Sequence, residues 1–310
     1  MSPFRLARSG AIGLIGLAFF GVEAVPVSLA VVLLGAALVV GLPHGALDHI
    51  LASRSPAWRD ARGQVAFHGA YLASVAAVLA GWWLVPGPTL LLFLLVAVWH
   101  FGETDILHHG AALRRSDVIL SRGLLIVFGA IHVSPDAAIH LLEIASGADV
   151  EMQLPLARTG GVWVPLCFWA VHARALWLAV GQGPTFASAL ADATGLVLLI
   201  MGAGPLVAFP LYFLVCHTPD HFVALARDGQ RTEPWQSVAR AALPRTLVSL
   251  VGVVGLWLLL DTSQWVTAVL WLVSALTLPH ALVVHLLLAR GGAAIRQRLG
   301  WTAPRETISV

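Results

Sequence analysis

Apolar stretches that approach the thickness of a bilayer's hydrocarbon core follow one another along almost the whole chain. A helix needs about 20 mostly apolar residues to span hydrocarbon, and Pro, Gly and Arg divide the chain into about ten such segments. The expected spans are 10–24, 26–49, 64–85, 88–106, 119–134, 160–180, 186–203, 205–226, 246–260 and 265–289. Some are short, so eight or nine spans remain alternative counts. The segments are continuous rather than alternating in polarity, which argues against a β-barrel.

Charged residues are too few to cover a water-soluble surface. Of the 310 residues only 11% are charged and 58% are hydrophobic, whereas a soluble domain carries about 25% charged residues. The formal net charge of +2 is too small and too dispersed to indicate nucleic-acid binding. The two cysteines, Cys167 and Cys216, lie in separate apolar stretches and imply no disulfide framework. The sequence therefore predicts a single domain, residues 1–310, that is an all-α, polytopic transmembrane helical bundle.

Arginines mark one side of this expected bundle. They precede the first span and follow the second, fourth, eighth and tenth spans, whereas the opposite connections carry acidic residues such as Glu143 and Asp149. Arg158 alone breaks the pattern. Because basic loops stay in the cytoplasm, the distribution predicts that both termini are cytoplasmic. The expected location is the inner (plasma) membrane.

Five histidines lie at matched depth inside these apolar stretches: His44, His100, His217, His221 and His280. At about 1.5 Å of rise per residue, their depths differ by no more than about 9 Å. Their four spans run in the same direction, so four helices can present imidazoles to one region in the cytoplasmic half. A bilayer protein has little reason to bury imidazoles unless they bind or move something. His172 shares this depth, so depth alone does not select the set.

His217 and His221 stand four residues apart, so on a helix both rings lie on one face and can reach one metal ion. Pro219 lies between them and is expected to distort that turn.

His44 lies between Pro43 and Gly45, which indicates a broken or kinked helix. Such a break is tolerated at membrane depth where it is buried or lines a cavity. Asp48, four residues on, either fixes the tautomer of a ligand histidine or marks the membrane edge.

His100 is followed by Glu103, which is expected on the same face, and by Asp105. A carboxylate here serves as a ligand, as an acceptor behind a ligand, or as a residue at the membrane edge. His280 follows Pro279, and a ligand, a group behind the ligands and a substrate contact are all open roles for it. A histidine-rich, carboxylate-poor set suits Fe, Zn or Cu.

Four ordered motifs resemble the Brp/Blh family of bacterial and archaeal membrane β-carotene 15,15′-dioxygenases. They are Pro-His-Gly-Ala-Leu-Asp at 43–48, His-Phe-Gly with an Asp at 100–105, Tyr-Phe followed by a His-x3-His pair at 212–221, and Leu-Pro-His at 278–280. The resemblance covers most of the chain, and four motifs in order are far more specific than any one of them.

The resemblance implies an Fe(2+)-dependent enzyme that uses O₂ to split the central 15,15′ double bond of β-carotene into two all-trans-retinal molecules. It also implies a link to a microbial rhodopsin, which uses retinal. By match to the family's motifs, His44, His100, His217 and His221 are the expected iron ligands. Asp48, Glu103, Asp105, Tyr212 and His280 are expected behind the ligands or beside the substrate.

The chain departs from the family's pattern in three places. The family typically has Ser and Arg between the paired histidines, where this chain has Thr218-Pro219-Asp220, and this change of charge puts the substrate preference in doubt. His285 stands where relatives carry an acid. The N-terminal apolar segment looks like an addition to the family's shorter members.

Two other classes of protein remain open on the residues alone. A di-iron desaturase or hydroxylase usually draws on about eight histidines with HxxHH boxes, whereas the adjacent pair His108-His109 has no partner at that spacing. A metal or ion transporter could line a path with histidines and aspartates, but no inverted repeat is evident.

Overall fold

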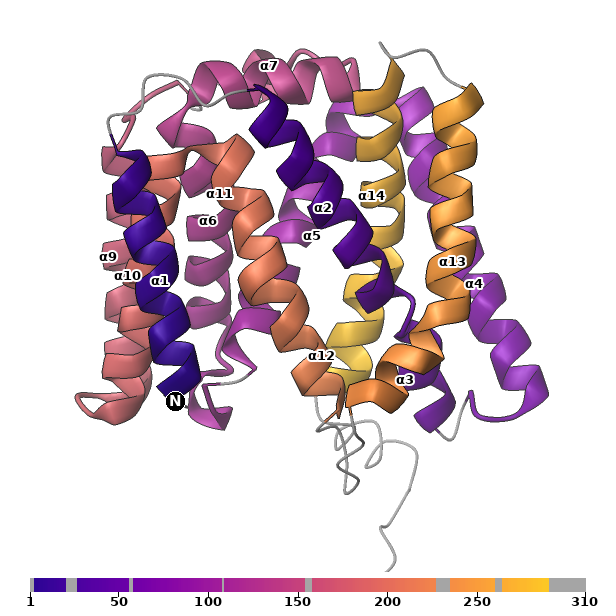
Figure 1. Ribbon diagram of the computed structural model, residues 1–310, viewed down its shortest axis with the longest axis horizontal. Helices are drawn as coiled ribbons and strands as arrows, with labels where there is room; N and C mark the ends of the chain where they lie inside the picture. Colours follow the sequence, from indigo (N-terminus) through magenta and orange to yellow (C-terminus); the bar gives the residue numbers. More distant parts are fainter. Residues whose placement is uncertain are drawn as a thin grey trace, which may run out of the picture.

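The computed structural model describes residues 3–20, 27–55, 58–107, 109–153, 158–226, 235–259 and 264–289. In these ranges all regular structure is helical, which confirms the all-α prediction (Figure 1). Seven helical segments of the described part are long and apolar enough to cross a membrane. They are α4 (Ala61–Leu84), α5 (Pro86–Ile106), α6 (Ser116–Val133), α9 (Trp163–Val180), α10 (Pro184–Ala203), Pro205–Ala224 and Thr267–Leu287. The chain is therefore a multi-pass membrane protein.

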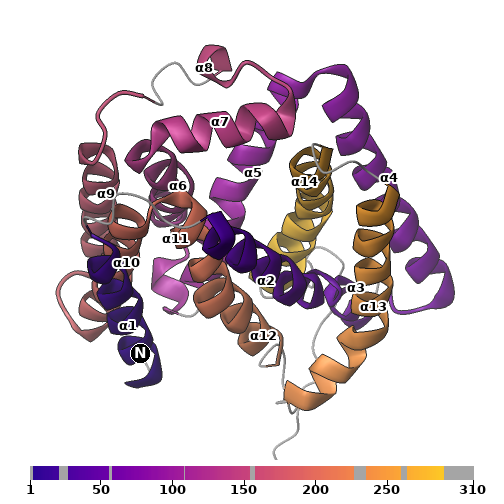
Figure 2. The same ribbon diagram turned by 45° about the horizontal axis from the view of Figure 1, so that its top comes forward.

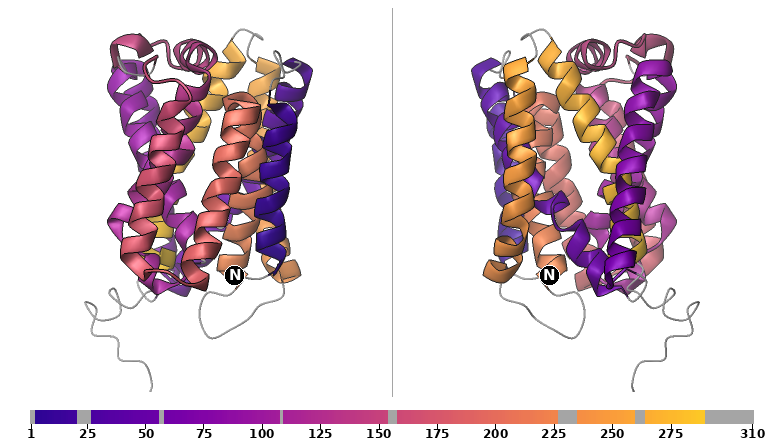
Figure 3. Two further views of the ribbon diagram at one scale, coloured as in Figure 1. Left: turned by 90° about the vertical axis from the view of Figure 1, so that its left-hand side faces the viewer. Right: turned by 90° about the vertical axis from the view of Figure 1, so that its right-hand side faces the viewer.

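Three further long helices of the described part accompany these seven: α1 (Pro3–Phe19), α2 (Val27–Gly45) and α13 (Trp235–Leu259). Within α1 and α2, the stretches Leu6–Phe19 and Val32–Gly41 are apolar but shorter than a full span. In the side views of Figure 3, most of the long helices run between the same two ends of the bundle. The count of ten spans and the orientation of the termini stay predictions.

Three of the expected spans are broken in the structure. The span expected at 26–49 ends at Gly45, and a short helix, α3 (Asp48–Arg54), follows it. The span expected at 205–226 consists of α11 (Pro205–Tyr212), a π-helical turn η2 (Phe213–His217) and α12 (Thr218–Ala226). The last span is α14 (Trp265–Val283), continued by a second π-helical segment, η4 (Val284–Ala289). Each break lies close to a predicted histidine.

The π-helical turn η2 has a local cause. Pro219 carries no N–H, so the carbonyl four residues before it, that of Val215, loses its α-helical donor. Just upstream, the N–H of Thr218 bonds to the carbonyl of Phe213, five residues back. Wider turns of this kind are common at functional sites, and this one ends at His217.

The acidic connection expected after residue 134 forms a helix of its own. It is α7 (Pro135–Ser146), which lies across one end of the bundle, at the top of Figure 1. Gly147, with φ 67°, ends it in the left-handed conformation and donates its N–H to the carbonyl of Glu143. The short helix α8 (Val150–Gln153) follows.

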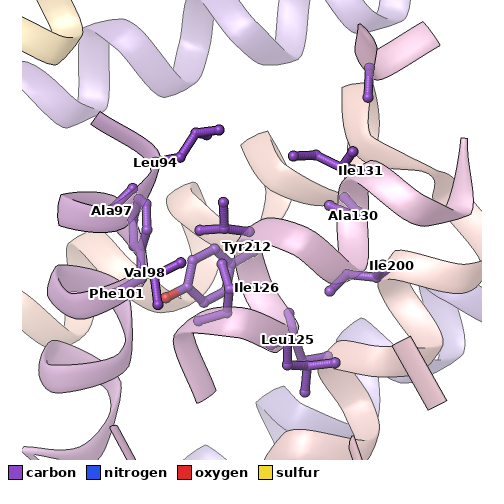
Figure 4. Close-up of a cluster of buried hydrophobic side chains, with 14 of the residues drawn as sticks. Leu94, Ala97, Val98, Phe101, Leu125, Ile126, Ala130, Ile131, Ile200 and Tyr212 are labelled. Atoms are coloured by element: carbon purple, nitrogen blue, oxygen red, sulfur yellow. The ribbon is translucent and has the colours of Figure 1, made fainter. Parts of the chain in front are cut away.

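Glycines set the closest helix contacts. A Cβ on Gly102 of α5 would overlap the carbonyl oxygen of Ile119, and one on Gly123 of α6 would overlap the carbonyl oxygen of Val98. Helices α5 and α6 therefore cross with their backbones touching, as small residues allow in membranes. Figure 4 shows the apolar cluster around this contact, with Tyr212 of α11 lying between the two helices.

Helices α1 and α10 pack in the same way. Added Cβ atoms at Gly16 of α1 and at Gly195 and Gly202 of α10 would each overlap backbone atoms of the other helix. The pair therefore fits along much of its length without room for a methyl group.

The helices that carry the predicted histidines meet inside the bundle. Helix α14 packs against α4 and α5, and its labelled position in Figure 2 is near the middle of the ring of helices. Helix α2 packs against α11, η2 and α12. This arrangement gathers the four motif-bearing segments around one region.

Candidate metal centre

Four imidazole rings form a closed set in the interior: His100 of α5, His217 at the end of η2, His221 of α12 and His280 of α14. Their exposed fractions lie between 2% and 4%. Ring centroids are 5.2 Å apart for His100 and His217, 4.9 Å for His100 and His280, 5.2 Å for His221 and His280, and 6.5 Å for His217 and His221. Helix α5 and the turn η2, more than 100 positions apart in the sequence, thus bring imidazoles into contact.

These spacings suit rings that share one ion. Imidazole nitrogens lie about 2.1 Å from a borderline metal, so two such rings hold their centres roughly 4.5 to 6.5 Å apart. As they stand, no three His, Cys, Asp or Glu side chains of the described residues have donor atoms gathered tightly enough to hold an ion. The donor type and the ring spacing fit a metal, and binding requires the rings to turn or a further donor to join them.

The side chain of His44, a predicted ligand, lies outside the described residues. Its backbone forms the last turn of α2. Gly41 of the same helix lies so close to η2 that an added Cβ would come within 2.6 Å of the Phe213 ring. The end of α2 therefore adjoins the segment that carries His217.

Asp48 orients His280. Nδ1 of His280 lies 2.8 Å from Oδ1 of Asp48, and the hydroxyl of Tyr71 donates to Oδ2 of Asp48 at 3.0 Å. A carboxylate on Nδ1 places a proton there and leaves Nε2 as the donor, as is usual behind metal-bound histidines. The sequence left Asp48 either behind His44 or at the membrane edge; in the described part it contacts His280, and a contact with the side chain of His44 stays a prediction.

A weaker contact lies behind His217. The hydroxyl of Thr104 donates to the carbonyl of His100 at 2.8 Å, and its oxygen lies 3.4 Å from Nδ1 of His217. Thr104 therefore joins α5 to the π-helical turn, and it was not predicted.

Glu103 lies beside the cluster and pairs with a residue from η4. Its Oε1 is 2.7 Å from Nδ1 of His285. Its other oxygen is buried and has no hydrogen-bond partner among the described residues. Glu103 thus links α5 to η4 through His285.

Asp105 belongs to a separate charged network rather than to the imidazole set. It accepts a hydrogen bond from Nε of Arg122 at 2.9 Å and another from the hydroxyl of Tyr212 at 2.6 Å. Arg122 also donates to Asp192 at 2.7 Å, and Asp192 accepts from Ser9 at 2.7 Å. Two buried carboxylates and one guanidinium thus tie α5, α6, α10 and α1 together.

Tyr212 connects the two sites. Its hydroxyl belongs to the charged network, while its ring lies 6.2 Å from that of His217 and 5.9 Å from that of Phe101. Its predicted role behind the ligands or beside the substrate stays a prediction.

His172, which shared the predicted depth, lies elsewhere. Its Nδ1 is 2.8 Å from the hydroxyl oxygen of Ser121 on α6, and no ring contact in the described part joins it to the four imidazoles. Matched depth therefore does not imply convergence, because the direction of each helix face also matters.

Sequence reasoning missed Arg122 and Asp192, although both lie inside expected spans. Opposite charges buried in two apolar segments are a signal for a pair. Nothing local marks Tyr71 or Ser9, because their partners lie on distant segments.

The fold and the cluster define a class: a polytopic helical membrane protein with a buried, histidine-rich centre. The model of one protein family, β-carotene 15,15′-dioxygenase, matches residues 35–288. The chain therefore belongs to the β-carotene 15,15′-dioxygenase family. This makes it a dioxygenase rather than a desaturase or a transporter.

Two relatives agree with this assignment. A β-carotene 15,15′-dioxygenase from uncultured marine bacterium 66A03 is 24% identical over 252 residues, which cover 79% of this chain and 89% of the relative. A probable β-carotene 15,15′-dioxygenase, Blh, from Halobacterium salinarum is 27% identical over 303 residues, which cover 86% of each chain. No solved structure matches the chain.

Proposed function

We propose that this protein cleaves β-carotene at its central 15,15′ double bond with O₂ and gives two molecules of all-trans-retinal. The balance is simple: one C=C bond and one O=O bond break, two C=O bonds form, and each aldehyde takes one oxygen atom. Both named relatives carry this activity in their names. The closed set of four buried imidazoles is the structural observation that supports it.

The centre would hold Fe(2+) through His44, His100, His217 and His221, with His280 as a fifth imidazole at the same point. Bound iron would supply the activation of O₂. The contact of His280 with Asp48 leaves its Nε2 as the donor atom. This nitrogen would therefore be the ligand atom of His280, whose sequence motif left its role open.

Apolar rings screen the centre from water. The ring of Phe101 lies 4.8 Å from that of His217, and Phe213 stacks on His217 at 5.1 Å. Such a site keeps reactive oxygen chemistry away from bulk water. A hydrocarbon substrate dissolved in the bilayer reaches it without crossing an aqueous phase.

The cytoplasmic placement of both termini, and a location in the inner membrane, complete the proposal. They rest on the distribution of arginines. Retinal released within the bilayer would be available to a microbial rhodopsin in the same membrane.

Coexpression in a β-carotene-producing bacterium tests the reaction. We expect loss of the orange colour and appearance of retinal, and labelled O₂ should place one labelled oxygen in each retinal. A colour loss that yields apocarotenals of unequal length would overturn the central position of cleavage.

Removal of the metal tests the cofactor. Treatment of the purified protein with a ferrous chelator should abolish retinal formation, and Fe(2+) should restore it where Zn²⁺ does not. Equal recovery with Zn²⁺, or two coupled irons per chain, would contradict a mononuclear iron centre.

A further inference from the structure

Helix α1 reaches the segment that carries His217 and His221, although it lies outside the part of the chain that the family model matches. The match begins at residue 35, whereas α1 spans Pro3–Phe19. Its Arg8 forms a forked pair with Asp220 of α12: Nη1 donates to Oδ1 at 2.9 Å and Nη2 to Oδ2 at 2.8 Å. Asp220 is the residue directly before His221.

The same guanidinium also approaches the other side of His217. Its Nη1 lies 3.4 Å from the carbonyl oxygen of Val215, two residues before His217. This carbonyl has no α-helical donor, because Pro219, four residues on, carries no N–H. The contact is long and therefore weak, but it supplies a positive charge where the helix has lost an N–H. Arg8 thus contacts the backbone carbonyl of Val215, before His217, and the side chain of Asp220, after it.

The pair is shielded from water. The side chains of Arg8 and Asp220 are 8% and 13% exposed. A forked arginine–carboxylate pair fixes direction as well as distance, and burial weakens the screening that makes surface pairs ineffective. Arg8 can therefore restrain the turn rather than merely lie near it.

Helix α1 is itself held firmly, so it can act as a support. Its glycine contacts with α10 leave no room for a methyl group. Next to Arg8, the hydroxyl of Ser9 donates to Asp192 of α10 at 2.7 Å. The position of Arg8 is thus set by packing that does not involve α12.

We propose that Arg8 is a positioning residue that clamps the turn between His217 and His221, and that α1 is a supporting part of the metal centre. The inference rests on the proposed iron function, since the restrained residues are the expected ligands. Groups one step behind a ligand typically change metal affinity or activity about 10- to 100-fold. We assign Arg8 an effect at the lower end of that range.

The test compares full-length variants purified in detergent. Arg8→Ala removes the clamp, and R8D/D220R rebuilds the pair with the charges exchanged. Ser9→Ala loosens α1 without touching the pair, and Arg115→Ala breaks the exposed Arg115–Asp117 pair as a matched control. For each, the iron retained per chain is measured against rising chelator concentration, together with kcat, KM and thermal stability.

We expect Arg8→Ala to release iron at about tenfold lower chelator concentration, with kcat falling in proportion to iron and KM unchanged. R8D/D220R should recover most of the retention, Ser9→Ala should lose less iron than Arg8→Ala because the pair stays in place, and Arg115→Ala should hold iron as the parent does. The clamp is overturned if Arg8→Ala retains iron normally, or if R8D/D220R folds but recovers nothing. If Arg8→Ala fails to fold, the exchanged pair decides: normal retention supports the clamp and lost retention rejects it.

The clamp and the proposed function fail in different ways. A parent protein that makes retinal with no iron bound removes the iron proposal itself. A parent that holds iron, beside an Arg8→Ala variant that holds it equally well, removes only the clamp.

Discussion

The imidazole set and the charged network lie in the same bundle and share Tyr212, yet their chemistry differs. The network pairs opposite charges, because Arg122 bonds to both Asp105 and Asp192. The four imidazoles instead face one another, with His100 edge-on to both His217 and His280. Buried ionisable groups inside a membrane often mark a functional site, and we propose that a cation joins these four rings. The burial of polar groups does not by itself indicate a functional site, because both regions are buried. What distinguishes the two regions is the kind of partner that each polar group contacts.

The largest expected effect comes from removing an imidazole. His217→Ala should reduce retinal formation more than about 100-fold, since even groups behind ligands cost 10- to 100-fold, while the protein stays in the membrane. Iron content and retinal yield are measured together. His172→Gln is the matched control, because it changes a buried histidine of equal depth that faces Ser121. Undiminished retinal from the His217 variant would remove the central claim.

Breaking the charged network should damage folding rather than chemistry. Arg122→Met leaves two buried carboxylates without their counter-charge, and loss of one partner of a buried pair costs about 3–5 kcal/mol. Thermal unfolding in detergent should show this loss. The triple variant R122M/D105N/D192N, which removes the charges together, should recover most of the stability and keep its iron. Iron loss in a well-folded triple variant would show that the charged network is part of the metal centre.

A smaller effect is expected from the residues that hold an imidazole in place by hydrogen bonds. Asp48→Asn keeps the size of the side chain but weakens its hold on His280, so iron affinity should fall about 10- to 100-fold. Tyr71→Phe removes the other hydrogen bond to Asp48 and should have the milder effect. Iron titration measures both. Unchanged affinity in Asp48→Asn would show that His280 is not a ligand.

The smallest effect tests the residue that the two regions share. Tyr212→Phe removes one hydrogen bond to Asp105, about 1 kcal/mol of stability, and its ring still packs against Phe101. A stability loss of this size leaves nearly all of the protein folded, so retinal formation should stay close to that of the parent. A far larger loss of kcat with full iron would make Tyr212 part of the chemistry.

Much of the fold could be predicted because the apolar length and composition of a segment largely decide whether it forms a membrane helix. Apolar length and arginine placement predicted helical spans, and the His-x3-His spacing predicted two rings on one face. The break at Pro219 was also expected, since a missing N–H acts within one turn. The seven helices and the ring pair agree with these predictions.

The partners of the carboxylates could not be predicted. Asp105 stands close to His100 in sequence, so it was expected near the site, but its side chain turns toward Arg122 on another helix. Asp48 stands close to His44 but binds His280, 232 positions away. Which face of one helix meets which face of another depends on long-range packing, such as the glycine contact of α5 with α6.

The contact of α1 with α10 and α12 also has a consequence for the order of synthesis. Arg8 leaves the ribosome early, but its partner Asp220 follows 212 positions later. At about 5–20 residues per second, translation needs roughly 10–40 s to cover that distance. Until then Arg8 of α1 has no Asp220 to bind. Contacts between segments so far apart in the sequence form late in folding. The turn that carries His217 and His221 therefore reaches its final form only when α1 meets a segment that is made 212 positions later.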